Sequence, residues 1–197
     1  MSSVSVATLK TYFNTGDKPT EANFIDVFDS MLNLADGGSI AGLAQFDAGI
    51  EKGVSLLSGG KTLTSADSGD VCIFNAAAET VCVLPAPNLG MKFDFICVIT
   101  ATGDHVVQAG TDDHGFLGGV TCTQLSSTAT DQCDSFSTAT DGNNDFITMN
   151  GTTTGGVAGS TLMCAAILAT SAAKAWAVTG NLICTGAMAT PFADSQI

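Results

Sequence analysis

Histidine and aspartate gather in one stretch of the chain and raise the question of catalysis or metal binding. Asp104-His105 and Asp112-Asp113-His114 could come together across a hairpin. However, adjacent carboxylates such as those of Asp112 and Asp113 point to opposite faces of a strand, which is poor geometry for acid–base chemistry. The sequence also holds no GxSxG elbow, no Walker loop and no GxGxxG fingerprint. We therefore expect no enzymatic activity here, and exposed loop side chains rather than a metal site.

A second stretch has the beginning of a calcium-binding pattern. In Asp141-Gly142-Asn143-Asn144-Asp145, side chains with oxygen ligands recur at alternate positions. Phe146 stands where such a loop needs Gly, and Thr152 stands where it needs a distal Glu. A turn rich in Asn and Asp is the favoured interpretation. The sequence predicts neither a bound metal nor a cofactor.

The seven cysteines are an odd number, and none forms a CxxC pair. A cysteine inside an apolar run behaves as a small buried hydrophobe, and this applies to five of them: Cys72, Cys82, Cys97, Cys164 and Cys184. Cys122 and Cys133 instead flank a polar stretch. They could form a disulfide if the protein meets an oxidising exterior.

Charge excludes several classes of partner. The net charge is −13 and the six basic residues are all Lys. A nucleic-acid backbone would be repelled, and the guanidinium fork that recognises phosphate is missing. An anionic membrane surface is disfavoured for the same reason. The N-terminal residues lack a signal-peptide pattern, and no apolar run reaches the length of a membrane span. We expect a protein made in a cytosol that binds neither nucleic acid nor membrane.

Residues 1–35 are predicted to be helical. Thr20 can cap a helix that follows Pro19, with Glu21 in its first turn. That helix places five apolar side chains on one face at helical spacing: Phe24, Val27, Phe28, Met31 and Leu32. This stripe must be buried, either against the chain's own β domain or against a partner subunit. We predict that it is the partner-binding site.

The rest of the chain is predicted to form a β domain behind a linker. Residues 36–60 are rich in Gly and indicate a linker or extended arm. From Lys61 the apolar period becomes two, and 71–74 with 80–84 suggest a hairpin. Short strands between Gly, Asn and Asp turns predict a mainly β fold over 61–197, a jelly-roll-like β-sandwich. Further strands are expected at 92–100, 104–109, 117–123, 145–149, 160–169, 174–179 and 182–186.

The segment Tyr12-Phe13-Asn14-Thr15-Gly16-Asp17-Lys18-Pro19-Thr20-Glu21, with the residues around it, resembles the N-terminal segment of a group of bacteriophage head-fibre, tail-fibre and capsid-decoration proteins. Weaker similarity to their β domain occurs at 63–69, at 83–87 and at 176–180. The resemblance implies a virion surface protein, often a homotrimer. The absence of long fibrous repeats departs from a tail fibre and favours a compact decoration, or cement, subunit. Cysteine-rich strands are not part of the group's pattern.

The resemblance thus predicts a structural virion protein on the phage capsid surface, bound to the major capsid protein or another virion subunit. Residues 1–57 would make the main contact, and the acidic β domain would face outward. The alternative is a head- or tail-fibre adhesin that binds host glycan, although one Trp and one Tyr offer few stacking surfaces. A secreted lectin-like module and a catalytic depolymerase are weaker interpretations.

Overall fold

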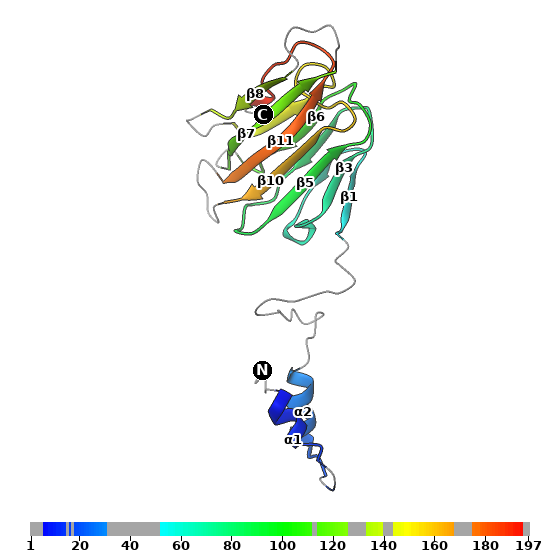
Figure 1. Cartoon of the computed structure of the whole chain (residues 1–197), viewed down its shortest axis with the longest axis vertical. Helices are drawn as coiled ribbons and strands as arrows, with labels where there is room; N and C mark the ends of the chain where they lie inside the picture. Colours follow the sequence, from blue (N-terminus) through cyan, green and yellow to red (C-terminus); the bar gives the residue numbers. More distant parts are fainter. Residues whose placement is uncertain are drawn as a thin grey trace. The chain divides into compact units, whose positions relative to one another are not determined.

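The chain divides into two compact units, Met1–Ile50 and Glu51–Ile197, in a computed structural model. The structure describes residues 6–14, 16, 18–30, 52–111, 114–125, 133–139, 144–167 and 175–194. Two helices belong to the first unit, and every described strand belongs to the second (Figure 1). The protein is mainly β with a short helical N-terminal segment, as the sequence predicted.

The helical unit contains α1 (Val6–Thr11) and α2 (Glu21–Ser30). Thr20 caps α2 in a reciprocal arrangement. The backbone N–H of Asn23 donates to Thr20 Oγ1 at 3.3 Å, and the backbone N–H of Thr20 donates to Asn23 Oδ1 at 2.9 Å. The predicted cap is therefore confirmed, and the exchange satisfies two amides at the helix start. No helix in the described part of the chain is long and apolar enough to cross a membrane.

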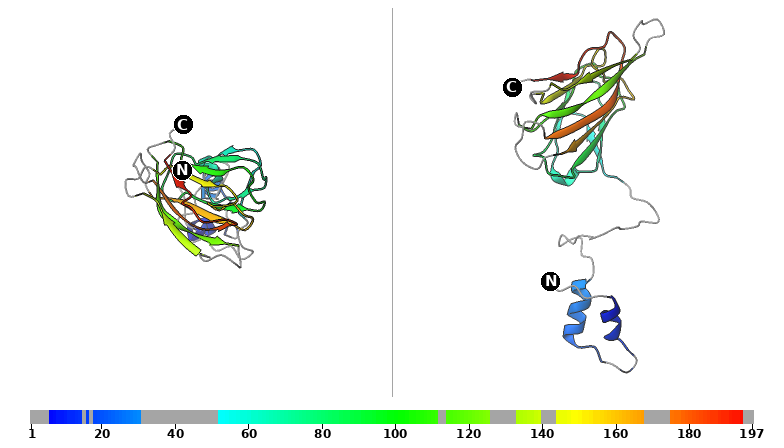
Figure 2. Two further views of the ribbon diagram at one scale, coloured as in Figure 1. Left: turned by 90° about the horizontal axis from the view of Figure 1, so that it is seen from above. Right: turned by 60° about the vertical axis from the view of Figure 1, so that its left-hand side comes forward.

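The β domain is a sandwich of two sheets, which the two views of Figure 2 show from above and from the side. The larger sheet has the strand order β1-β3-β5-β10-β11-β7-β8, and the smaller has β12-β9-β6-β4-β2. The strands of the larger sheet are β1 (Val54–Leu57), β3 (Val71–Phe74), β5 (Lys92–Cys97), β7 (Phe116–Gln124), β8 (Cys133–Ser137), β10 (Thr161–Ala166) and β11 (Trp176–Cys184). Those of the smaller sheet are β2 (Lys61–Thr62), β4 (Thr80–Val83), β6 (His105–Gln108), β9 (Phe146–Met149) and β12 (Phe192–Ala193), and a 3-10 turn, Ser65–Asp67, follows β2.

The first six strands wind between the two sheets instead of forming hairpins. Strands β1, β3 and β5 pair in parallel in one sheet, while β2, β4 and β6 pair in parallel in the other. The predicted hairpin of 71–74 with 80–84 is therefore wrong, because β3 and β4 lie in opposite sheets. The turn between them crosses the sandwich and stacks on the next turn, where Thr102 N–H donates to the Ala77 carbonyl at 2.7 Å.

The later strands close this winding with mostly antiparallel pairs. β9 and β10 run antiparallel to β6 and β5, and β11 pairs antiparallel with β10 but parallel with β7. The sandwich is confirmed, but its parallel pairs depart from the all-antiparallel jelly roll. The segments expected at 174–179 and 182–186 form one strand, β11, and β1 lies inside the range assigned to the linker. β12 falls where no strand was predicted, whereas β8 lies in the stretch 127–146, whose ten-residue repeat predicts strand-plus-turn units.

The core lies between the two sheets and contains the inward side chains of alternating residues. Trp176, Phe74, Phe93, Phe95 and Phe116 are fully buried there. The Trp176 ring lies 5.9 Å from the Phe93 ring. All five cysteines predicted to be core residues are buried and unpaired. This alternation explains why a period of two in the sequence was a reliable guide to strands.

Candidate functional site

An exposed apolar surface lies on the helical unit, and we call it the aromatic helix face. Its members share a large side chain and high exposure: Phe13 (50%), Phe24 (45%), Ile25 (51%) and Phe28 (68%). The Phe13 and Phe24 rings pack edge to face, with their centroids 5.9 Å apart. Because so much apolar area remains in contact with water, this surface is a candidate binding site for a partner.

The aromatic helix face overlaps the predicted stripe only in part. Phe24 and Phe28 are exposed as the site requires, whereas Val27 is half-buried. Met31 and Leu32 lie outside the described residues. The sequence interpretation missed Phe13 and Ile25. The helical spacing of Phe24, Ile25 and Phe28 could have indicated a broader face, since i, i+3 and i+4 positions are neighbours.

A hydrogen bond joins the turn after α1 to α2 and adds to the Phe13–Phe24 contact in orienting α2. The Tyr12 hydroxyl donates to Asp26 Oδ2 at 2.9 Å across the turn that joins the two helices. The acceptor carboxylate raises the pKa of the Tyr12 hydroxyl. This contact directs Asp26 toward α1 and leaves Phe28 open to water.

His105 has a structural environment, and the expectation that it is an exposed loop side chain is wrong, because it begins strand β6 and points into the core. Its ring is fully buried and stacks on the Phe74 ring, with the two ring centroids 4.6 Å apart. The ring donates a hydrogen bond from Nε2 to the Ala76 carbonyl oxygen at 2.8 Å. The Cys97 thiol lies 3.7 Å from its Nδ1. Desolvation by burial lowers the pKa of His105. The neutral ring is thus held as part of the core, with both nitrogens partnered.

Ser55 and Lys61 form another contact that resembles a nucleophile beside a base. Lys61 Nζ donates to Ser55 Oγ at 2.8 Å, and Ser55 Oγ donates to Asp70 Oδ2 at 2.7 Å. However, the hydrogen bond and ion pair with Asp67, at 2.7 Å, raise the pKa of Lys61. A lysine held in its charged form cannot accept the serine proton. This cluster therefore satisfies buried polar groups and does not make a catalytic dyad.

No metal site appears among the residues that the structure describes, where no three His, Cys, Asp or Glu side chains are grouped. His114 lies beside Thr111, with Oγ1 3.0 Å from Nδ1, while Asp112 and Asp113 lie outside the described residues. Of the calcium-like stretch, 141–143 also lie outside them. Asn144 Oδ1 accepts the Ala139 backbone N–H at 2.5 Å, which is the role of an Asn in a turn.

Cys122 and Cys133 do not form a disulfide. Cys122 is buried and Cys133 is exposed, and both are unpaired. In the β7–β8 ladder Cys133 pairs with Thr123, while Cys122 pairs with Asp134. Neighbouring residues of a strand point to opposite faces, so the two thiols are directed apart. Burial raises the pKa of the Cys122 thiol to about 12.

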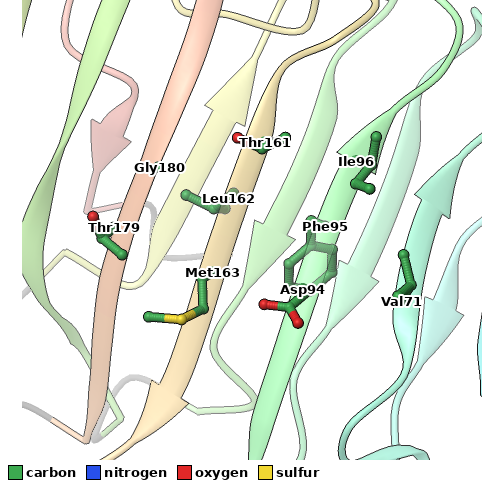
Figure 3. A pocket seen from close by; sticks show the side chains of 9 residues that line it. All are labelled: Val71, Asp94, Phe95, Ile96, Thr161, Leu162, Met163, Thr179 and Gly180. Atoms are coloured by element: carbon green, nitrogen blue, oxygen red, sulfur yellow. The ribbon is translucent and has the colours of Figure 1, made fainter. Parts of the chain in front are cut away.

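A shallow groove crosses the outer face of the larger sheet (Figure 3). One part has a volume of about 450 Å³ and is lined by Val71, Asp94, Phe95, Ile96, Thr161, Leu162, Met163, Thr179 and Gly180. A neighbouring part of about 360 Å³ lies over β7 and β8 and is also bordered by Thr179 and Gly180. The side chains of Ile96, Met163 and Thr179 stand on the outer face.

Comparison with known proteins gives no relative. No protein-family model, no curated protein sequence and no solved structure matches this chain.

Proposed function

We propose that this chain is a structural, non-enzymatic protein of a bacteriophage virion, a decoration (cement) protein of the head surface. The observation that carries the proposal is the aromatic helix face, because its exposed rings lie on a short helical hairpin that precedes the β domain. Rings of this kind dominate binding energy when a partner buries them. The proposed partner is the major capsid protein or another virion subunit. The N-terminal similarity to phage surface proteins supports the same assignment.

The charge of the β domain supports an outward orientation on the particle. Residues 93–173 contain eight Asp and no Lys. Asp is depleted in the core of protein interfaces, whereas an acidic surface keeps a crowded protein soluble. β1 is a strand of the larger sheet, so the predicted contact segment 1–57 includes the first strand of the β domain.

The alternative role, glycan binding by a fibre adhesin, has less support. A glycan site commonly offers an exposed aromatic ring for stacking. In the described part of the groove, Phe95 is buried and Phe136 is half-buried. The aromatic helix face is therefore the stronger candidate for the functional surface.

The exposed area gives the expected strength of attachment. A phenylalanine side chain buries roughly 200 Å² in full. With 68% of Phe28 and 45% of Phe24 exposed, docking would remove about 130 and 90 Å² from water, at about 25 cal/mol per Å². After allowance for the area that an alanine keeps, each ring contributes about 2 kcal/mol. Replacing both should weaken binding by about a thousandfold.

The proposal is tested first by composition and then by binding. Virions purified from the phage that encodes the chain should contain it, by mass spectrometry, and its absence would overturn the proposal. The full-length Phe24→Ala/Phe28→Ala variant should then fail to cosediment with virions that lack the chain. The control is Leu89→Ala, which removes a side chain that is 64% exposed on the β domain. Equal binding by the double variant and the control would move the attachment site away from α2.

A further inference from the structure

The outer face of the larger sheet carries apolar side chains over four neighbouring strands, where a solvated face would carry charges. Alternate residues of β1, β3, β5 and β10 point outward, and the larger apolar ones are Val54, Leu56, Val71, Ile73, Ile96 and Met163. The ladders place them side by side. Val54 pairs with Val71, Leu56 with Ile73, and Ile73 with Ile96. Met163 and Val71 both pair with Asp94, so one carboxylate lies within the patch. We call this patch the sheet ridge.

The sheet ridge is open to water at the edge of the sheet. Val54 is 59% exposed and Leu56 is 58% exposed, both on the edge strand β1. Antiparallel and mixed sheets that leave one face in water normally show polar side chains there. Continuous apolar patches on a sheet face instead mark interaction sites.

The opposite half of the same face is hollow. Gly119 on β7 contributes no side chain, and its ladder neighbours Thr179 and Ser137 are small. The part of the groove over these strands has a volume of about 360 Å³. The groove continues across β3, β5 and β10, where Val71, Ile96 and Met163 line it, so the exposed side chains of Val54 and Leu56 at the β1 edge stand beside a hollow. Two copies related by a twofold axis can place the β1 edge of each over the hollow of the other. Such self-complementarity is what an interface between identical subunits requires.

Charge points to a second copy as the occupant. Two chains with a net charge of −13 repel each other over most of their surfaces. On the outward positions of the described strands in this face, the charged side chains are Lys92 and Asp94, and these are compensated. Asp94 accepts from Lys92 at 3.0 Å and from Lys52 at 2.7 Å. The face is therefore a broad surface on which copies can approach without repulsion.

The area is sufficient for association. Seven strands at about 4.8 Å spacing and about five residues of about 3.3 Å each give a face of roughly 30 by 17 Å. Covering this face in two copies would remove about 1,000 Å² of surface from water. This figure treats the face as flat and leaves out the additional area of the protruding side chains. This reaches the lower range for specific interfaces.

We infer that the outer face of the larger sheet binds the same face of a second copy of this chain. The inference does not depend on the proposed attachment through α2, because it concerns another surface and another partner. It also assigns the groove of Figure 3 to protein–protein contact.

The test measures the mass of the full-length chain by sedimentation equilibrium at micromolar concentration. The wild type should have at least twice the chain mass of 19.9 kDa. Leu56→Asp and Met163→Asp should both reduce it to one chain mass, since each adds negative charge to both sides of the contact. Leu56 is more than half exposed, so its variant should fold even if Met163→Asp does not, and thermal melting checks this.

Two matched variants separate this inference from the proposed function. Leu89→Asp adds the same charge at an exposed loop, and Phe28→Asp adds it to the aromatic helix face. Both should retain the wild-type mass, while Phe28→Asp alone should lose binding to virions. A monomeric wild type, an associated Leu56→Asp variant, or dissociation caused by Phe28→Asp but not by Leu56→Asp would each overturn the inference.

Discussion

Gly180 lies on β11 in close contact with β10, and its replacement should destabilise the β domain. A Cβ atom at Gly180 would lie 2.4 Å from the Thr161 carbonyl oxygen and 3.0 Å from Leu162 Cα. An ordinary carbon–oxygen contact needs about 3.3 Å, so the two strands would have to separate by nearly 1 Å. β10 cannot yield easily, because it is paired on both sides, with β5 and with β11.

The size of the effect follows from two opposing contributions. Overpacking of this kind costs about 3 kcal/mol. The loss of conformational freedom in the unfolded chain returns about 0.5–1 kcal/mol to an alanine variant. The net loss in the free energy of unfolding should be about 2 kcal/mol, or about 4–8 °C in Tm for a domain of this size.

Thermal and urea unfolding of Gly180→Ala provide the measurement, with Gly186→Ala as the control. A Cβ atom at Gly186 would meet its nearest neighbour at 3.7 Å, and neither glycine has a positive φ. The control should therefore be as stable as the wild type or slightly more stable. Equal stability of Gly180→Ala and the wild type would refute the close strand approach, and equal destabilisation by both variants would show a nonspecific cost of removing glycine.

Three further predictions concern charge and thiols. Hydrogen bonds from Lys61 and Thr64 lower the pKa of Asp67 to about 2 from the ordinary 3.8. A pKa difference is equivalent to about 1.4 kcal/mol per pH unit, and after reduction by solvent screening Asp67→Asn should lower the free energy of unfolding by about 1 kcal/mol near neutral pH. This difference between variant and wild type should vanish as pH falls from about 4 toward 2, and its persistence at pH 2 would contradict the assignment. Burial lowers the pKa of His105, so stability should be constant above about pH 6.5 and decrease below it; His105→Gln should remove that slope in acid melts, and an unchanged slope would exclude His105 as its source. Cys133 is the exposed thiol, whereas the other six cysteines are buried; one thiol per native chain should react rapidly with Ellman's reagent, and rapid reaction in a Cys133→Ser variant would refute the burial of the rest.

Local patterns allowed the elements to be predicted, but not their connection. The period of two around Cys72 and Phe74 indicates a strand, yet a hairpin and a turn that crosses a sandwich have the same sequence appearance: apolar, polar, apolar. What distinguishes them is the parallel pairing of β3 with β5 and of β4 with β6, which joins residues far apart in the chain. β1 was missed because four residues among glycines show too short an alternation, although Ser55 and Leu57 are buried.

Two members of the aromatic helix face, Phe24 and Phe28, could be predicted from the sequence, whereas the side of α2 that stays exposed could not. Helical spacing correctly put Phe24 and Phe28 on one face of α2. The side of α2 that remains exposed depends on contacts such as that between Tyr12, in the turn after α1, and Asp26 on α2. These contacts leave Ile25 exposed and Val27 half-buried, and no periodicity within one helix contains that information.

The two proposed surfaces would act together on a particle. Attachment through the aromatic helix face relies on apolar area, and that face is small. If two copies join through the sheet ridge, two helical units can dock at once, and the second docking becomes intramolecular. Dissociation from a virion then requires both to release together. Leu56→Asp should therefore shorten the residence time of the chain on virions without changing the affinity of a single helical unit. Dissociation kinetics of Leu56→Asp and Leu89→Asp from virions would measure this, and identical rates would mean that attachment occurs through independent copies.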